Sequence, residues 1–113
     1  MTKVDKKDFT RAVNEIVRMI PYGRATSYGA IAKAIGYPNM SRMVGHLIGG
    51  DDGGGAVPAY RVVNSSGVLS GKESFGSSGE MQQLLEAEGI TVVNDKIKNW
   101  KKVFWNPLDE IEL

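Results

Sequence analysis

The residue types that carry chemistry are few in this chain, and they limit what it can do. The sequence contains no cysteine and a single histidine, His46. Disulfides, thiolate zinc sites and cysteine nucleophiles are therefore excluded, and we expect neither a metal site nor a cofactor. A Ser-His-Asp catalytic site would have to use His46, and a lone histidine is more often a surface residue than a base.

The stretch Pro58-Ala59-Tyr60-Arg61 has the setting of a site but not its chemistry. It follows a glycine-rich loop and leads into a short apolar strand and a Ser-Ser-Gly turn. Alanine has no reactive group, and a tyrosine phenol with a pKa of about 10 is not a base at neutral pH. On these residues alone, the stretch is either an ordinary strand entrance or a catalytic position that now holds inert side chains.

The residues from Asn39 to Ile48 predict a helix with two distinct faces. Apolar side chains line one face, and Arg42, Gly45, His46 and Gly49 share the other. Each glycine inside a short helix costs about 1 kcal/mol relative to alanine, and close approach of another surface, such as a nucleic-acid backbone, would explain it. The alternative is that Gly45 packs against another helix, Gly49 only caps the helix and Arg42 is solvated.

Two further helices are expected to position this face. Residues 9–20 carry apolar side chains at helical spacing and stop before Pro21. Residues 27–35 form the second helix, with Thr26 or Ser27 as N-cap and Gly36 as C-cap. Tyr28 begins that helix on its apolar face, where its ring would pack while its hydroxyl stays exposed. In the third helix, we expect Asn39 as the cap and a buried stripe of Met40, Met43, Val44, Leu47 and Ile48.

The remaining residues predict short strands around one more helix. Residues 60–71 are typical of two strands joined by a turn at 64–67, and Ser77 and Glu80 match a capping box for a helix that ends at Gly89. Residues 90–95 and 97–105 are expected to pair as terminal strands with aromatic anchors. We expect a single α+β domain over residues 1–113, without a signal peptide or a membrane span.

The charge distribution favours nucleic acid as a partner. Residues 1–50 hold eight Lys and Arg against three acidic residues, whereas residues 51–113 hold six against ten. Such asymmetry is typical of a chain with one basic face that meets DNA or RNA, although scattered solvated charge is the plainer interpretation.

Several motifs together resemble the C-terminal domain of O-6-alkylguanine-DNA alkyltransferases. They lie in "IPYGRATSYGAIAKAIGYPNMSRMVGHLI" (20–48), "VPAYRVVNSSGVLSG" (57–71) and "LLEAEG" (84–89). The similarity covers about residues 9–90. It implies a winged-helix-like helix-turn-helix fold whose third helix enters the DNA minor groove.

The resemblance also implies roles for individual residues. Arg42 would fill the space left by a flipped nucleotide, Tyr28 would help to turn the phosphate, and Gly45 and Ala30 would permit close approach to the groove. The implied DNA-binding residues are Ser27, Tyr28, Ala30, Ser41, Arg42 and Gly45. The implied lesion pocket consists of Tyr28, Val57, Pro58, Ala59, Tyr60, Arg61, Ser70 and Gly71.

Departures from the family pattern concern the catalytic motif Pro-Cys-His-Arg. The alkyl-accepting cysteine is Ala59, the histidine is Tyr60, and Glu88 matches the glutamate that orients that histidine. Because alkyl transfer needs a thiolate, the chain is expected not to be an enzyme. Asp51 and Lys72 also stand where the family has other residues.

The chain therefore resembles the alkyltransferase-like members that lack the cysteine. This implies binding of double-stranded DNA with alkylated guanine, without repair, to mark the lesion for nucleotide excision repair proteins. We expect a monomer in the bacterial cytoplasm, associated with the nucleoid when bound to DNA. One alternative is a general winged-helix DNA-binding protein without damage specificity. The other is an enzyme with a different reaction, for which Tyr60, Glu88 and His46 are the local candidates.

Overall fold

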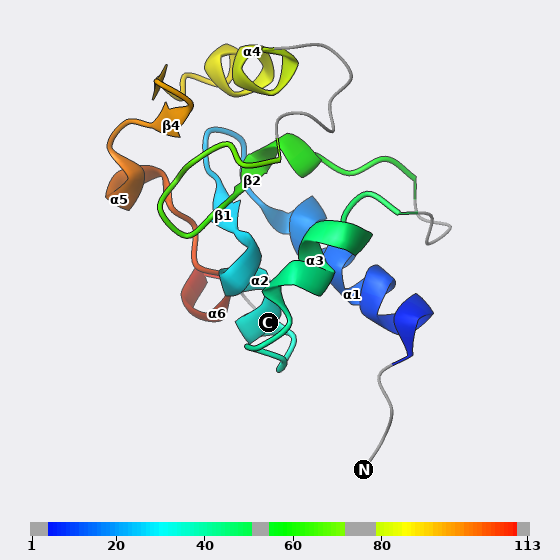
Figure 1. The fold of residues 1–113 in the computed structure, drawn as a ribbon. Coiled ribbons are helices and arrows are strands. Elements are labelled where there is room, and N and C mark those ends of the chain that lie inside the picture. Colours follow the sequence, from blue (N-terminus) through cyan, green and yellow to red (C-terminus); the bar gives the residue numbers. More distant parts are fainter. Residues whose placement is uncertain (1–4, 51–54, 72–78, 111–113) are drawn as a thin grey trace.

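Short helices dominate the fold, and short strand pairs connect them. The computed structural model describes residues 5–50, 55–71 and 79–110. Asp51, Lys72 and Ser77 lie outside these ranges. The predicted capping box is wrong, because Gly79 is the N-cap of the helix that begins at Glu80, and no side chain caps it. The elements in chain order are α1 (Lys6–Met19), β1 (Thr26–Ser27), α2 (Tyr28–Ala34), α3 (Ser41–Leu47), the 3-10 turn η1 (Ala59–Arg61), β2 (Val62–Val63), α4 (Glu80–Ala87), β3 (Val92–Val93), β4 (Lys96–Ile97), α5 (Trp100–Val103) and α6 (Pro107–Glu110) (Figure 1).

Helix α1 begins three residues before the predicted start at Phe9 and ends at Met19. Asp5 explains the early start, because its side chain accepts hydrogen bonds from the backbone N–H groups of Lys7 and Asp8, at 2.8 and 3.4 Å. Ile20 is extended, as expected of a residue before proline. The predicted apolar stripe is buried in a core shared with α2 and α3, except for Ala12, which is half-buried.

The helix-turn-helix of α2 and α3 is present as the sequence predicts. The Ser27 hydroxyl caps α2 by accepting from the Ala30 N–H at 3.1 Å, and Gly36 has the left-handed φ of +89° that ends it. The predicted Asn39 cap is wrong: Met40 is the N-cap of α3, and no side chain caps this helix.

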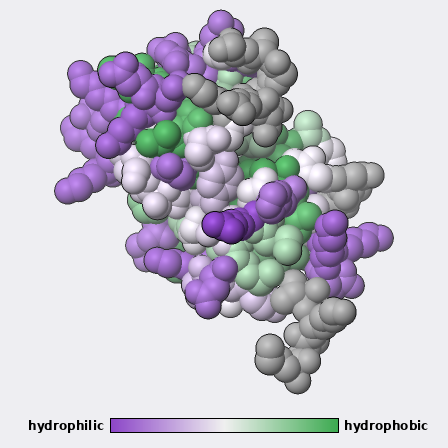
Figure 2. Space-filling model, viewed as in Figure 1, coloured by the Kyte–Doolittle hydropathy of each residue, from purple (hydrophilic) through white to green (hydrophobic). Residues whose placement is uncertain are grey.

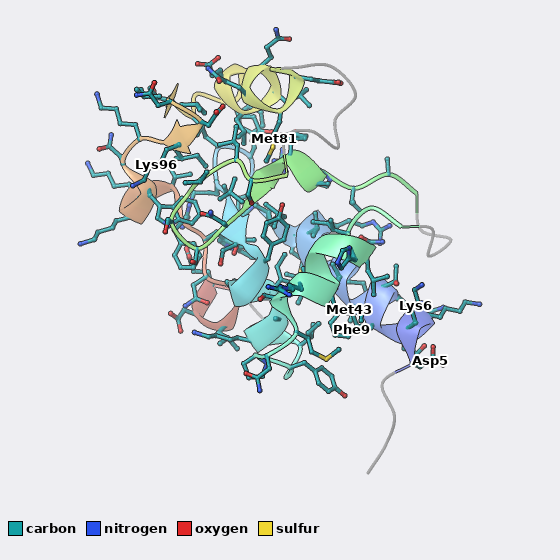
Figure 3. All side chains as sticks on the ribbon, in the orientation of Figure 1. Asp5, Lys6, Phe9, Met43, Met81 and Lys96 are labelled. Carbon is teal, nitrogen blue, oxygen red and sulfur yellow. The ribbon has the colours of Figure 1, made fainter. Side chains whose placement is uncertain are left out.

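The predicted buried stripe of α3 is also partly wrong. Val44 and Leu47 are buried, but Met43 is 39% exposed, because the residue before Val44 points about 100° away around the helix. Met43 lies with Phe9 at the rim of a small apolar hollow between α3 and α1 (Figure 3).

Two apolar cores lie on either side of a parallel strand pair. The first core joins α1, α2 and α3 with Trp105, and the second joins Leu69, α4 and the β3–β4 hairpin. Between them, Thr26 and Ser27 of β1 pair with Val62 and Val63 of β2. The mixed architecture confirms the predicted α+β class.

The predicted hairpin over residues 60–71 is not formed as expected. The turn is real, since Asn64 Oδ1 accepts from the N–H groups of Ser66 and Val68 at 2.9 Å. However, β2 pairs with β1, and Val68 makes only an isolated bridge with Lys96. A long-range partner therefore replaces the local one.

The C-terminal strand pair exists but is shorter than predicted. Asn94 and Asp95 both have positive φ, 51° and 62°, which suits the tight turn between β3 and β4. The chain then leaves the strand and forms α5, so Trp100 is helical. Trp105 is an anchor as expected, because it is buried and its backbone N–H donates to the Ala25 carbonyl at 2.7 Å.

No helix among the described residues is long and apolar enough to span a membrane.

Asn14 is a fully buried polar residue that the sequence pattern did not single out. Its Nδ2 donates to the Gly50 carbonyl at 2.9 Å, and its Oδ1 accepts from the Gly49 N–H at 3.0 Å. These two bonds give hydrogen-bond partners to the backbone N–H of Gly49 and the carbonyl of Gly50, which directly follow α3. They therefore fix the end of α3 against α1.

Replacement of Asn14 by alanine should destabilise the protein by about 2 kcal/mol, because two buried backbone groups lose their partners. The free energy of unfolding in urea measures this loss. Asn39→Ala, at an exposed position, is the matched control and should change stability by less than about 0.5 kcal/mol. Equal stability of the two variants would contradict the assigned role of Asn14.

Candidate nucleic-acid interface

An open groove of about 470 Å³ lies where three segments meet. The start of α2, the exposed face of α3 and the chain after β2 each contribute to it. Its lining consists of Tyr28, Ser41, Arg42, Gly45, His46, Ser70 and Gly71. Six of these residues belong to the predicted DNA-binding or lesion-pocket sets, and the seventh, His46, was predicted to lie on the same helix face. The fold therefore brings distant predicted residues to one surface.

Tyr28 stands at the centre of this groove and is held by its surroundings. Its ring is half-buried against the first core, and its hydroxyl bonds to the Ser70 side chain. Burial raises the pKa of the Tyr28 phenol, and the bond with Ser70 opposes this only in part, so the phenol is protonated at neutral pH. A Cβ on Gly71 would lie 2.6 Å from the Tyr28 oxygen, so only glycine leaves room for the hydroxyl in this position.

The α3 face is flat apart from one long cation. Arg42 is exposed and forms no ion pair with another described residue. A Cβ on Gly45 would lie 3.8 Å from the Tyr28 ring, which is an ordinary contact. Because packing inside the molecule does not require glycine here, its helix cost of about 1 kcal/mol points to a surface that approaches from outside.

Ser27 and Ala30 lie apart from this groove. Both are buried, and the Ser27 oxygen already caps α2. They line a neighbouring hollow of about 340 Å³ together with Lys33, Ser65 and Trp100, among others. Their predicted DNA contacts, like those of Tyr28 and Arg42, stay predictions.

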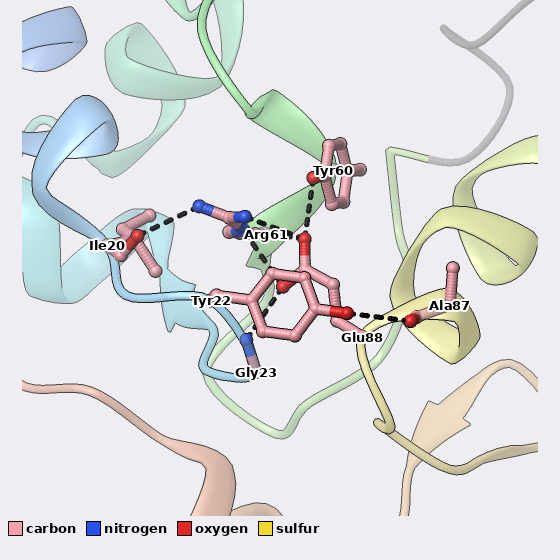
Figure 4. Close-up of polar contacts among 7 residues, drawn as sticks. All are labelled: Ile20, Tyr22, Gly23, Tyr60, Arg61, Ala87 and Glu88. Atoms are coloured by element: carbon pink, nitrogen blue, oxygen red, sulfur yellow. Dashed lines mark hydrogen bonds and ion pairs between the residues drawn. The ribbon is translucent and has the colours of Figure 1, made fainter.

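Tyr60, Arg61 and Glu88 form a hydrogen-bonded network (Figure 4). The Tyr60 hydroxyl donates to Glu88 Oε2 at 2.6 Å, and Arg61 Nη2 lies 2.7 Å from the same oxygen. Arg61 also donates to the Ile20 carbonyl at 2.9 Å. Tyr60 and Arg61 are thus directed at Glu88, and no residue of the 57–61 stretch is part of the lining of the Tyr28 groove.

Sequence reasoning missed two partners of this network. The Gly23 N–H donates to Glu88 Oε1 at 2.8 Å, and the Tyr22 hydroxyl donates to the Ala87 carbonyl at 2.9 Å. Both belong to the Ile-Pro-x-Gly motif. That motif was the available signal, but it does not say which distant residue its backbone meets.

The network controls the charge of Glu88. Burial alone would raise the pKa of this carboxyl, whose side chain is only 4% exposed. Hydrogen bonds from Arg61, Tyr60 and the Gly23 backbone outweigh burial and lower its pKa below the usual value. Burial and the bond to Glu88 raise the pKa of the Tyr60 phenol, so Tyr60 acts here only as a donor.

Across the described ranges, no three metal-ligating side chains gather into a possible metal site.

Glu88→Gln should destabilise the protein by about 3–5 kcal/mol at neutral pH, because Arg61 would lose its buried counter-charge. Since the folded-state pKa of Glu88 lies below its unfolded value of about 4.3, its stabilisation is complete above that pH and is lost as the pH falls through the folded value. Unfolding free energies measured from pH 7 to pH 3 should therefore fall more steeply in the original chain than in the variant.

Glu110→Gln is the matched control, because it breaks the exposed Arg24–Glu110 pair and should cost at most about 1 kcal/mol. If both variants lose the same stability, the Glu88 network is not a structural link.

Comparison with known proteins places this geometry in a family. The family model for the DNA-binding domain of 6-O-methylguanine DNA methyltransferase matches residues 8–90. A protein of Vibrio parahaemolyticus named DNA base-flipping protein is 38% identical over 92 residues, which cover 81% of this chain and 90% of that protein. Alkyltransferase-like protein 1 of Schizosaccharomyces pombe is 30% identical over 104 residues, which cover 88% of this chain and 96% of that protein.

Solved structures agree with these matches. The crystal structure of S. pombe Atl1 with damaged DNA containing O6-carboxymethylguanine superposes with a TM-score of 0.75 at 32% identity, covering 94% of this chain and 100% of that one. Mycobacterium tuberculosis OGT in complex with DNA gives a TM-score of 0.56 at 36% identity, covering 72% and 49%. The chain belongs to the 6-O-methylguanine DNA methyltransferase DNA-binding domain family, and its sequence contains no cysteine.

Proposed function

We propose that this protein binds double-stranded DNA containing O-6-alkylguanine and flips the damaged nucleotide without repairing it. The observation that carries the proposal is the Tyr28 groove, which brings Tyr28, Arg42 and Gly45 to one surface in a chain that contains no cysteine. Relatives named DNA base-flipping protein and alkyltransferase-like protein support it, as does the similar structure that holds damaged DNA.

In this proposal α3 enters the minor groove, where its exposed glycine-bearing face permits close approach. Arg42 extends from that face and fills the space left in the base stack, which offsets part of the cost of unstacking, a few kcal/mol. The protonated Tyr28 phenol donates to a phosphate or to a base edge from a position fixed by Ser70 and Gly71.

The bound lesion is then a mark for other proteins. Because the chain has no thiol to accept the alkyl group, the complex persists until another activity removes the damaged nucleotide. We propose that nucleotide excision repair proteins supply that activity, and that the chain acts as a monomer in the cytoplasm.

Fluorescence anisotropy with duplexes containing methyl-, benzyl- or unmodified guanine tests lesion binding. The alkylated duplexes should bind more tightly, and Arg42→Ala should weaken lesion binding by roughly 10- to 100-fold while reducing the preference for the lesion. Arg11→Ala removes the same charge from the exposed side of α1 and is the control. Equal affinity for all three duplexes, or a tight motif on undamaged DNA, would instead favour a general winged-helix DNA-binding protein.

Restoration of the missing chemistry tests the assignment of positions 59, 60 and 88. Ala59→Cys alone should transfer little, because Tyr60 is not a base at neutral pH. Ala59→Cys with Tyr60→His should transfer more, because Glu88 lies where it can orient a histidine at position 60. Intact-protein mass spectrometry after incubation with O-6-methylguanine DNA detects the added methyl group. If the single variant is as active as the double variant, this assignment is wrong.

A further inference from the structure

A cluster of lysines lies beyond the segment that matches the family model. Residues 96–104, "KIKNWKKVF", contain four lysines and no acidic residue, whereas the family match ends at residue 90. Lys96, Lys98, Lys101 and Lys102 are all exposed, and none forms an ion pair with a described residue. We call these four residues the lysine surface. Figure 2 shows hydrophilic residues gathered over β4 and α5, at its upper left, and Figure 3 places Lys96 on that side of the molecule.

The lysine surface is held rigidly against the Ser-Ser-Gly turn. Trp100 Nε1 donates to the Ser65 carbonyl at 3.1 Å, and the Ile97 N–H donates to the Gly67 carbonyl at 2.9 Å. A Cβ on Gly67 would lie 3.0 Å from the Trp100 ring, so the indole packs directly on the glycine backbone. The four cations therefore have fixed backbone positions relative to the turn.

The lysine surface is continuous with the helix-turn-helix. Its lysines and Ser66 border a hollow of about 800 Å³. Trp100 also borders the hollow that contains Lys33, Ser65 and the start of α2. One connected track thus runs from α2, past the Ser65–Ser66 turn, to β4 and α5.

We propose that the lysine surface is a second DNA contact, which binds backbone phosphates of the duplex beside the region that α3 occupies. This inference rests on the proposed function, because it places the same duplex across both surfaces. Exposed lysines act as mobile point charges and bind phosphates without reading sequence. Their continuity with the α2 start and with serine hydroxyls favours a nucleic-acid backbone over an acidic polypeptide. The lysine surface should add affinity without adding lesion preference.

The test compares two double variants with the same change in charge. Lys101→Gln/Lys102→Gln alters the lysine surface, and Lys6→Gln/Lys7→Gln alters exposed lysines at the start of α1, on the opposite side of the molecule (Figure 1). Affinities are measured by anisotropy over a range of salt concentrations, with an unmodified duplex and the same duplex carrying O-6-methylguanine. Thermal melting of both variants confirms that they fold.

We expect the Lys101/Lys102 variant to bind both duplexes more weakly by the same factor. The slope of log affinity against log salt should fall in magnitude by about 1 to 2, since each lost phosphate contact removes about 0.9. The Lys6/Lys7 variant should keep the original slope.

Two other results are distinguishable. Equal slopes and affinities for the two variants would overturn the second DNA contact and leave an acidic protein as the better partner for these lysines. If the original chain binds the unmodified and the O-6-methylguanine duplex with equal affinity, the proposed function is contradicted instead. The slope difference between the variants, on either duplex, would still decide the lysine proposal.

Discussion

The buried pair of Arg61 and Glu88 links segments that lie far apart in the chain. Arg61 belongs to η1, and Glu88 follows α4 in the second core. Through its other bonds the pair also reaches the Ile20 carbonyl at the end of α1 and the Gly23 N–H before β1. Since β1 and β2 contribute only two residue pairs, these side-chain bonds add to the connection between the two cores. The position of α2 relative to the 57–71 segment, and hence the shape of the Tyr28 groove, depends on them.

This network also accommodates the residues that stand at the positions of the implied catalytic motif. The glutamate that would orient a histidine here accepts from Tyr60, Arg61 and Gly23 instead. A change from histidine to tyrosine therefore leaves no unpaired buried carboxylate. Replacement of a cysteine by alanine at position 59 removes a reactive atom without introducing a polar group that needs a partner. Glu88 thus belongs to both the implied catalytic motif and the scaffold, whereas a side chain at position 59 makes no bond that the scaffold needs.

Local signals in the sequence predicted much of the fold. Ser27 and Gly36 marked the limits of α2 because a hydroxyl cap and a left-handed C-cap act within one turn of helix. Features that depend on distant partners were missed: β2 pairs with β1 rather than across its own turn, and the buried Asn14 bonds to backbone 35 and 36 residues away. The candidate groove was predictable in its residues, but only the structure shows which of them share a surface. The lysines of residues 96–102 went unnoticed because a charge sum over half the chain is dominated by ten acidic residues elsewhere.

The two tryptophans have different environments, and this gives the protein two optical reporters. Trp105 is buried in the first core, so its emission follows the integrity of the helical half. Trp100 is only half-buried and lies among the lysines on the Gly67 backbone. Its indole is therefore accessible to quenchers and to any molecule that occupies that surface. With one of the two indoles replaced by phenylalanine, the intrinsic fluorescence of the other separates unfolding of the helical core from occupancy of the C-terminal face, without an attached dye.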